Sequence, residues 1–196
     1  MARALGVVCG LVVALFVGFA TPAKASLIFG GNCPGASQVF SPWSDLRDYV
    51  FATNGGFELG SYGWSLTGGA YVTGGNEPFY LHSGSDSRSL YLPRGASATS
   101  PATCMATSST VIRFVSKGDT NLRVQIIERN LLGIVVNILS VSSVNGTSSW
   151  QPTPEITNLQ SLQGLLGVAT MQVKITAVDG AAQVDDLFVD PMGSRD

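Results

Sequence analysis

The sequence contains little charge and almost no histidine. Only 12% of its 196 residues are Asp, Glu, Lys or Arg, and His82 is the single histidine. Nucleic-acid binding requires clustered Lys and Arg to neutralise phosphates, and the chain lacks such a cluster. No G-x-S-x-G or H-E-x-x-H segment occurs, so His82 has no recognisable catalytic partners. We therefore expect a protein that is not an enzyme and has no nucleic-acid partner.

Long apolar runs are confined to the start of the chain. Arg3 precedes an apolar run over residues 5–20, and Ala23-Lys24-Ala25 has the small-x-small form that signal peptidase requires. This run is shorter than the roughly 20 residues that span a bilayer, which favours a signal peptide over a membrane anchor. Residues 1–25 are thus predicted to be removed, leaving a secreted, extracellular chain with 9 basic and 13 acidic residues and no membrane span.

Cysteine is scarce as well. Cys9 lies in the predicted signal, so Cys33 and Cys104 are the only cysteines of the secreted chain. In an oxidising compartment two cysteines most simply form one disulfide, and the alternative is two free thiols or a metal site. A Cys33–Cys104 bridge would attach an N-terminal arm, residues 26–52, to the rest of the protein.

Short strands and glycine turns characterise the remainder, which contains most of the chain's 23 glycines. Apolar and polar residues alternate with period two over residues 122–126 and 171–176, as in strands with one buried face. Thr110 to Lys117 is a further predicted strand, and Leu132 to Val141 is apolar on both faces, which predicts a central strand. Asn145-Gly146 is typical of a turn.

Helical spacing occurs only where leucines recur between Leu159 and Leu166, with glycines that weaken a helix, so at most a short helix is expected there. Seven to nine short strands without long alternating helices predict one all-β domain, an antiparallel β-sandwich over residues 53–191. Residues 192–196 would form a C-terminal tail.

Carboxylates lie in two short segments near the ends of this domain. NGGFELGSYGW, residues 54–64, contains Glu58, and QVDDLFVDP, residues 183–191, contains Asp185 and Asp186. First and last strands of a sandwich usually lie side by side, so these carboxylates are expected to approach one another. The apolar alternation also changes parity at the Asp185-Asp186 pair, which predicts a β-bulge.

Together with HSGSDSRSLYL at residues 82–92, these segments resemble the jelly-roll carbohydrate-binding modules of the galactose-binding-domain-like group. The resemblance implies a structural calcium ion and a sugar site on a sheet face or at edge loops. It assigns as calcium ligands Glu58, the carbonyl of the Ser83-Gly84 turn, and one or both of Asp185 and Asp186. Calcium prefers such oxygen donors, and the alternative is that these acids are solvated.

Aromatic side chains are the usual contacts of sugars in such modules. Trp64 is predicted to be buried, whereas Tyr80 and Trp150 are the candidate ligand-binding aromatics at an exposed edge. Glu58 and Asp186 could form a glycosidase pair, but so short a chain has little length for a catalytic cleft. We expect a secreted, non-catalytic module that binds carbohydrate, such as cell-surface polysaccharide. The alternative is a secreted structural or adhesion sandwich that contacts proteins and has no sugar site.

Overall fold

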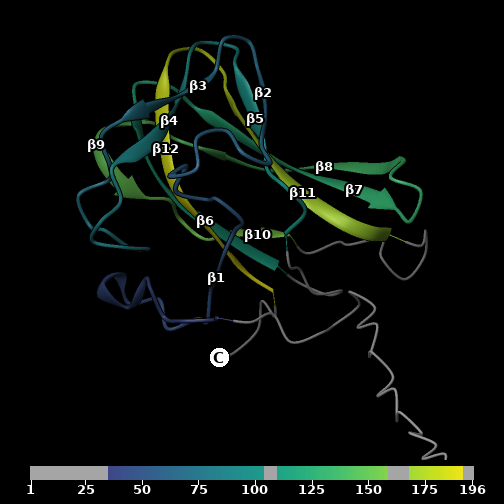
Figure 1. Ribbon diagram of the computed structural model, residues 1–196, viewed down its shortest axis with the longest axis horizontal. Helices are drawn as coiled ribbons and strands as arrows, with labels where there is room; N and C mark the ends of the chain where they lie inside the picture. The colour runs from purple at the N-terminus through teal and green to yellow at the C-terminus, as the bar shows by residue number, and fades with distance from the viewer. Residues whose placement is uncertain (1–34, 104–109, 159–167, 192–196) are drawn as a thin grey trace, which may run out of the picture.

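The computed structural model describes residues 35–103, 110–158 and 168–191. Twelve strands within these ranges form two antiparallel sheets that face each other as a sandwich (Figure 1). In the same ranges, no helix is long and apolar enough to cross a membrane. The predicted antiparallel β-sandwich is confirmed, and it has more strands than the seven to nine expected because several are only two to four residues long.

The elements, in chain order, are η1 (Ser41–Trp43), β1 (Val50–Phe51), β2 (Ser65–Thr67), β3 (Tyr71–Gly74), β4 (Arg88–Leu92), β5 (Ser97–Thr99), β6 (Thr110–Gly118), β7 (Leu122–Asn130), β8 (Val135–Val144), β9 (Thr147–Pro152), β10 (Ile156–Asn158), β11 (Val168–Ala177) and β12 (Ala182–Asp190). The seven-stranded sheet has the order β10-β6-β12-β4-β3, with β1 also paired to β12 and β9 to β6. The five-stranded sheet has the order β2-β5-β11-β7-β8.

The inner faces of the two sheets form the main core. Alternate residues of β7 and β11 point into it, as the period-two pattern predicted, and among them Val124 and Val173 are fully buried. Trp64 is also buried, at 7% exposure, and its indole nitrogen donates a hydrogen bond to the carbonyl of Asn54 at 3.0 Å. Trp64 therefore belongs to the core, as expected.

The prediction for residues 132–141 was wrong about position. The corresponding strand, β8, begins at Val135 and lies at the edge of the five-stranded sheet, where Ile138 remains 55% exposed. An apolar run on both faces indicates low polarity but does not identify its neighbours, and apolar residues are common on protein surfaces. Asn145-Gly146 does form the predicted connection, which leads from β8 to β9 in the other sheet.

Four predicted features lie outside the described residues and stay predictions. They are the signal peptide over residues 1–25, the Cys33–Cys104 disulfide, the short helix at Leu159 to Leu166 and the tail over residues 192–196.

The last strand changes its neighbour halfway along its length. Val184, in its first half, pairs with Leu90 of β4, whereas Phe188, in its second half, pairs with Phe51 of β1. Between the two halves the register with β6 shifts, which is the predicted β-bulge. The opening and closing strands therefore lie side by side.

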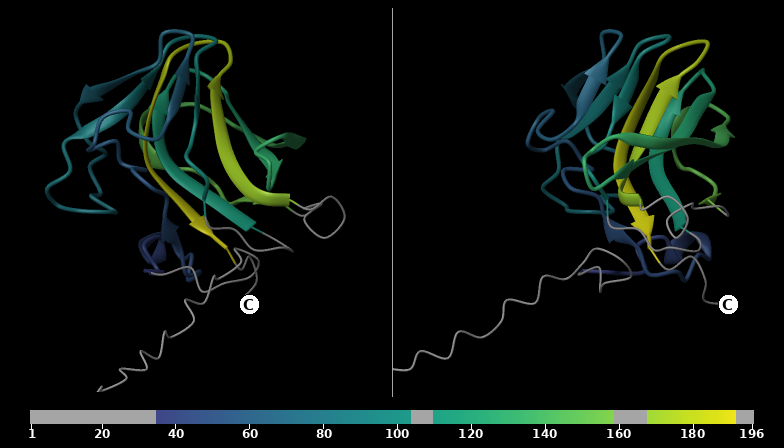
Figure 2. Two further views of the ribbon diagram at one scale, coloured as in Figure 1. Left: turned by 45° about the vertical axis from the view of Figure 1, so that its right-hand side comes forward. Right: turned by 90° about the vertical axis from the view of Figure 1, so that its right-hand side faces the viewer.

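The described part of the N-terminal arm packs on the outer face of the seven-stranded sheet. Phe40 and Tyr49 of the arm form a second apolar cluster with Val111 of β6 and Phe188 of β12. Figure 2 shows this segment, in dark blue, at the opposite end of the sandwich from β2 and β3. The arm therefore covers one end of that face and leaves the other end open.

A buried ion pair joins this arm to β6. Asp45 accepts hydrogen bonds of 2.7 Å from the Arg113 guanidinium and from the Tyr49 hydroxyl. The Arg113 guanidinium also lies 4.3 Å from the ring centre of Phe40. Burial alone would raise the pKa of Asp45, but the hydrogen bonds from Tyr49 and Arg113 outweigh it, so this pKa lies below its ordinary value.

We predict that Asp45→Asn lowers the free energy of unfolding by about 3 kcal/mol at pH 7, because it leaves the Arg113 charge buried without its counter-ion. The pKa of Asp45 is lowered on folding, so its contribution is present above about pH 4 and is lost as the pH falls through the folded pKa. Urea unfolding at pH 7 and pH 3 should show the difference from wild type shrinking at pH 3.

The exposed Asp119 supplies the matched control, Asp119→Asn, which should unfold like the wild type. A wild-type unfolding midpoint for Asp45→Asn at pH 7 would contradict the role assigned to this ion pair.

Candidate functional site

Buried carboxylates hold the loop that joins β3 to β4, residues 75–87. Glu77 is fully buried, and its carboxylate accepts hydrogen bonds from the amides of Phe79 and Leu81, the second at 2.8 Å. The Glu77 amide in turn donates to the carboxylate of Asp185 on β12 at 3.0 Å. The loop is thus attached to the last strand at the bulge.

Asp186 occupies the bulge itself. Its backbone has a φ of 48°, in the left-handed region that Asp tolerates better than most residues. One carboxylate oxygen, Oδ2, accepts a hydrogen bond from the His82 amide at 3.1 Å. The other, Oδ1, is buried and has no hydrogen-bond partner among the described residues. A Cβ atom at Gly56 would lie 2.8 Å from this oxygen, so the glycine keeps the space beside it open.

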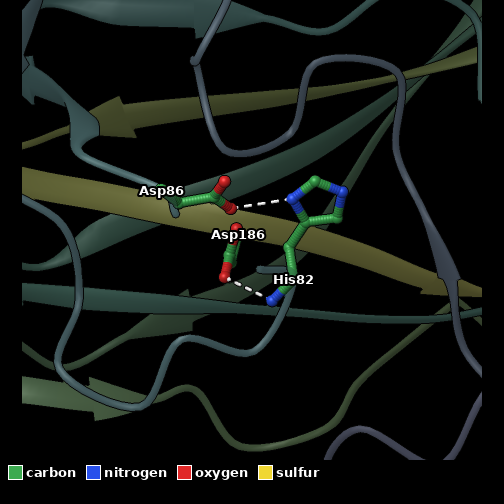
Figure 3. Close-up of side chains that lie close together, drawn as sticks. All are labelled: His82, Asp86 and Asp186. Carbon is green, nitrogen blue, oxygen red and sulfur yellow. Dashed lines mark hydrogen bonds and ion pairs between the residues drawn. The ribbon is translucent and has the colours of Figure 1, made fainter. Parts of the chain in front are cut away.

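His82 and Asp86 lie around the same oxygen (Figure 3). The His82 Nδ1 atom is 2.7 Å from Oδ2 of Asp86, and the imidazole stacks on Phe51 with a centroid separation of 3.8 Å. One donor atom each from His82, Asp86 and Asp186 lies within 4.8 Å of the other two. These three residues, called the His-Asp-Asp cluster below, form an arrangement that can bind a metal ion.

The electrostatics of the cluster favour a cation. Burial, followed by the charge of Asp186, raises the pKa of Asp185 to about 9. Burial also raises the pKa of Asp186 to about 7, despite the hydrogen bond from the His82 amide, and the charges of Glu77 and Asp86 contribute to the increase. A bound cation would offset this repulsion and keep both carboxyl groups ionised.

The metal ligands predicted from the sequence do not all lie at one site in the structure. Asp186 belongs to the His-Asp-Asp cluster, whereas Asp185 accepts hydrogen bonds from the amides of Glu77 and Asp186. Glu58 accepts hydrogen bonds of 2.7 Å from the amides of Ser87 and Arg88, where β4 begins. The carbonyl of Ser83 accepts from the Asp86 amide at 3.1 Å, which closes the turn between His82 and Asp86.

Sequence reasoning missed three members of the site, His82, Asp86 and Glu77. A signal was present, because His82 and Asp86 flank a Ser-Gly turn that can bring both side chains to one side. Glu77 had no comparable signal, since its role depends on hydrogen bonds to a strand 108 positions later.

A second set of side chains crosses the open end of the seven-stranded sheet. Tyr71 on β3 pairs with Tyr91 on β4, Tyr91 with Gln183 on β12, and Gln183 with Lys117 on β6. Lys117 lies over the Trp150 ring of β9, 4.8 Å from its centroid. We call these five residues the aromatic row. Strand spacing gives the row from Tyr71 to Lys117 a length of about 14 Å.

The aromatic row is accessible to a ligand. Tyr71 is 52% exposed, and its ring centroid lies 5.2 Å from that of Tyr91. A shallow cavity of about 280 Å³ borders Tyr91, Lys117 and Gln183. Trp150, one of the two predicted ligand-binding aromatics, belongs to this row. The other, Tyr80, is 50% exposed on the β3–β4 loop, two residues before His82.

Comparison with solved structures shows the fold. The chain is similar to the enzymatically active domain of tailspike protein 4 of bacteriophage CBA120 (TM-score 0.52, 13% identity), covering 70% of this chain and 21% of that one. It is also similar to a Clostridium thermocellum xylanase structure with a family 22 carbohydrate-binding module and a catalytic module, complexed with xylohexaose (TM-score 0.50, 12% identity, 75% and 29% covered). The chain thus spans less than a third of both proteins.

A xylan-binding domain of Paenibacillus barcinonensis, also of family 22, aligns over 76% of this chain and 97% of its own length, with 14% identity and a TM-score of 0.49. No protein-family model and no curated protein matches the sequence. The two antiparallel sheets, with the similarity to the tailspike and xylanase structures, confirm the jelly-roll-like β-sandwich that the sequence resemblance implied.

A substitution at Glu58 tests whether its carboxylate accepts backbone hydrogen bonds or binds a cation. We predict that Glu58→Ala lowers the free energy of unfolding by about 2 kcal/mol, because two backbone amides lose a charged acceptor. Since these amides do not belong to the His-Asp-Asp cluster, the loss should be the same with and without EDTA in urea unfolding. A loss that disappears in EDTA would show instead that Glu58 is a cation ligand.

Proposed function

We propose that this chain is a secreted, non-catalytic binding module that recognises carbohydrate through the aromatic row. The observation that carries the proposal is that two tyrosines, an amide, a lysine and a tryptophan from five strands lie in one cross-strand row on an open sheet face. Aromatic rings can stack on the C–H face of a sugar, while amide and ammonium groups bind its hydroxyls.

Two of the structures to which this chain is similar support this proposal. The Paenibacillus domain is described as xylan-binding, and the Clostridium protein is a xylanase. Polysaccharides are therefore the first ligands to test. The row has no paired carboxylates, which is consistent with binding instead of glycoside cleavage.

We further propose that a divalent cation in the His-Asp-Asp cluster stabilises the module. The sequence resemblance implies calcium as this cation. A cation there would join β12, through Asp186, to the loop that contains His82 and Asp86. Because Tyr80 lies on the same loop, the cation would also hold the second predicted ligand-binding aromatic in place.

Protein contact without a sugar site is the second candidate function. Leu131, Leu132 and Ile134, in the connection between β7 and β8, are 80%, 82% and 57% exposed. This hairpin projects at the right of Figure 1, away from the seven-stranded sheet. An apolar projection of this kind is typical of protein-contact surfaces.

A glycan array followed by calorimetry on the best-bound polysaccharide tests the sugar site. Tyr71→Ala and Trp150→Ala should each weaken binding about tenfold, the upper range for loss of one aromatic contact. Tyr62→Ala is the matched control, since Tyr62 is an aromatic residue that is 69% exposed outside the row, and it should bind like the wild type.

Tyr80→Ala tests whether sugar binds at the β3–β4 loop instead of at the aromatic row. Loss of binding in this variant alone would move the sugar site to the β3–β4 loop. No binding to any polysaccharide on the array by the wild type would reject the carbohydrate proposal and favour the exposed β7–β8 hairpin as the functional surface.

Removal of the cation should lower the melting temperature. We expect EDTA to lower Tm by about 5 °C or more, because a bound ion stabilises only the folded state. Asp186→Asn should melt at the same temperature with and without EDTA, since Asn tolerates the left-handed backbone but is a poorer cation ligand. Asp119→Asn should respond like the wild type. An unchanged wild-type melting curve in EDTA would reject the cation.

A further inference from the structure

The donor atoms of the His-Asp-Asp cluster define the kind of ion it can accept. Two are carboxylate oxygens, from Asp86 and Asp186, and the third is a ring nitrogen of His82. Nδ1 is the ring nitrogen that lies beside the carboxylates, 2.7 Å from Oδ2 of Asp86. Calcium takes six to eight oxygen ligands, and an imidazole nitrogen is not among its usual donors. Zinc and similar first-row transition ions accept imidazole together with carboxylates, with three protein ligands and a water.

The neighbouring oxygens that calcium would need are directed elsewhere. Glu77 accepts hydrogen bonds from the amides of Phe79 and Leu81, and Asp185 accepts from those of Glu77 and Asp186. The Glu58 carboxylate faces the amides at the start of β4. These carboxylates therefore hold the backbone of the β3–β4 loop and of the start of β4. The His-Asp-Asp cluster itself offers a cation two carboxylate oxygens and one imidazole nitrogen.

Two observations indicate that the cluster is built for a ligand. Oδ1 of Asp186 is buried and has no hydrogen-bond partner in the described residues, and Figure 3 shows it directed toward Asp86. An ionised oxygen in this position has lost its hydration without gaining a hydrogen bond, and a bound cation would compensate for that loss. The absence of a Cβ at Gly56 leaves room beside this oxygen, with Oδ2 of Asp86 only 3.6 Å from where a Cβ would be.

Neighbouring groups fix the orientation of two of the three donors. The Phe51 ring, stacked at 3.8 Å, restricts the orientation of the imidazole. Oδ2 of Asp186 is held by the His82 amide, which leaves Oδ1 as the ligand atom. His82 is 40% exposed at its side chain, so solvent can supply the remaining ligand.

We propose that the His-Asp-Asp cluster binds a first-row transition ion such as Zn²⁺ in preference to calcium, with Nδ1 of His82 as the donor that decides the selectivity. This inference rests on the proposal that a cation binds the cluster, and it is independent of carbohydrate recognition.

The experiment uses the fact that His82 is the only histidine of the chain. In ¹⁵N-labelled protein without a histidine tag, one imidazole spin system reports directly on the site. One equivalent of Zn²⁺ added to EDTA-treated, dialysed protein should shift the His82 Nδ1 resonance, and 1 mM Ca²⁺ should leave it unchanged. At a hundredfold excess over Kd, Zn²⁺ should also raise Tm by roughly 5–10 °C.

His82→Gln keeps the size of the side chain and removes the imidazole donor, so it should reduce the Zn²⁺-dependent Tm increase to that of Asp186→Asn. Stabilisation of the wild type by Ca²⁺, with the His82 resonance unmoved, would overturn the selectivity while keeping a cation site. No response to either ion would overturn both the selectivity and the site. Carbohydrate binding, measured separately, distinguishes these failures from a failure of the sugar proposal.

Discussion

A group of buried carboxyl side chains at a β-bulge is the constraint on which the rest of this structure depends. Glu77, Asp86, Asp185 and Asp186 are all largely excluded from solvent at one place. Buried carboxylates are costly unless they are hydrogen-bonded or paired with a cation. Here half of their oxygens accept hydrogen bonds from backbone amides of the β3–β4 loop, so the loop and the bulge stabilise each other. Oδ1 of Asp186 accepts no hydrogen bond from the described residues, and it is the oxygen that a metal ion would bind.

The position of the bulge also determines which end of the outer face of the seven-stranded sheet stays uncovered. At the bulge β12 exchanges β4 for β1 as its neighbour, and the β3–β4 loop with the N-terminal arm covers that end of the outer face. The other end keeps the regular pairing of β3, β4, β12 and β6, and regular pairing aligns side chains in rows. The five side chains of the aromatic row therefore lie together at the end of the sheet opposite the buried ion pair of the arm.

Much of the fold could be predicted from the sequence because alternation of apolar residues is a local signal. It identified β7 and β11, and the parity change at Asp185-Asp186 identified the bulge. The edge position of β8 could not be predicted, because strand order depends on distant partners. The site was predicted in part: Asp186 follows from its motif, whereas His82 joins it through a loop path set by hydrogen bonds across about 100 residues. Glu58 also belongs to a motif, yet its carboxylate serves two backbone amides in this structure.

The bulge in β12 and the β3–β4 loop together carry the three residues of the His-Asp-Asp cluster. A crystal structure of the protein loaded with Zn²⁺, with anomalous data collected at the zinc edge, shows whether they form one metal centre. We expect one strong anomalous peak within about 2.0–2.2 Å of His82 Nδ1, Asp86 and Asp186 Oδ1. A peak at other residues, or a retained 2.7 Å contact between His82 and Asp86 without an ion, would contradict it.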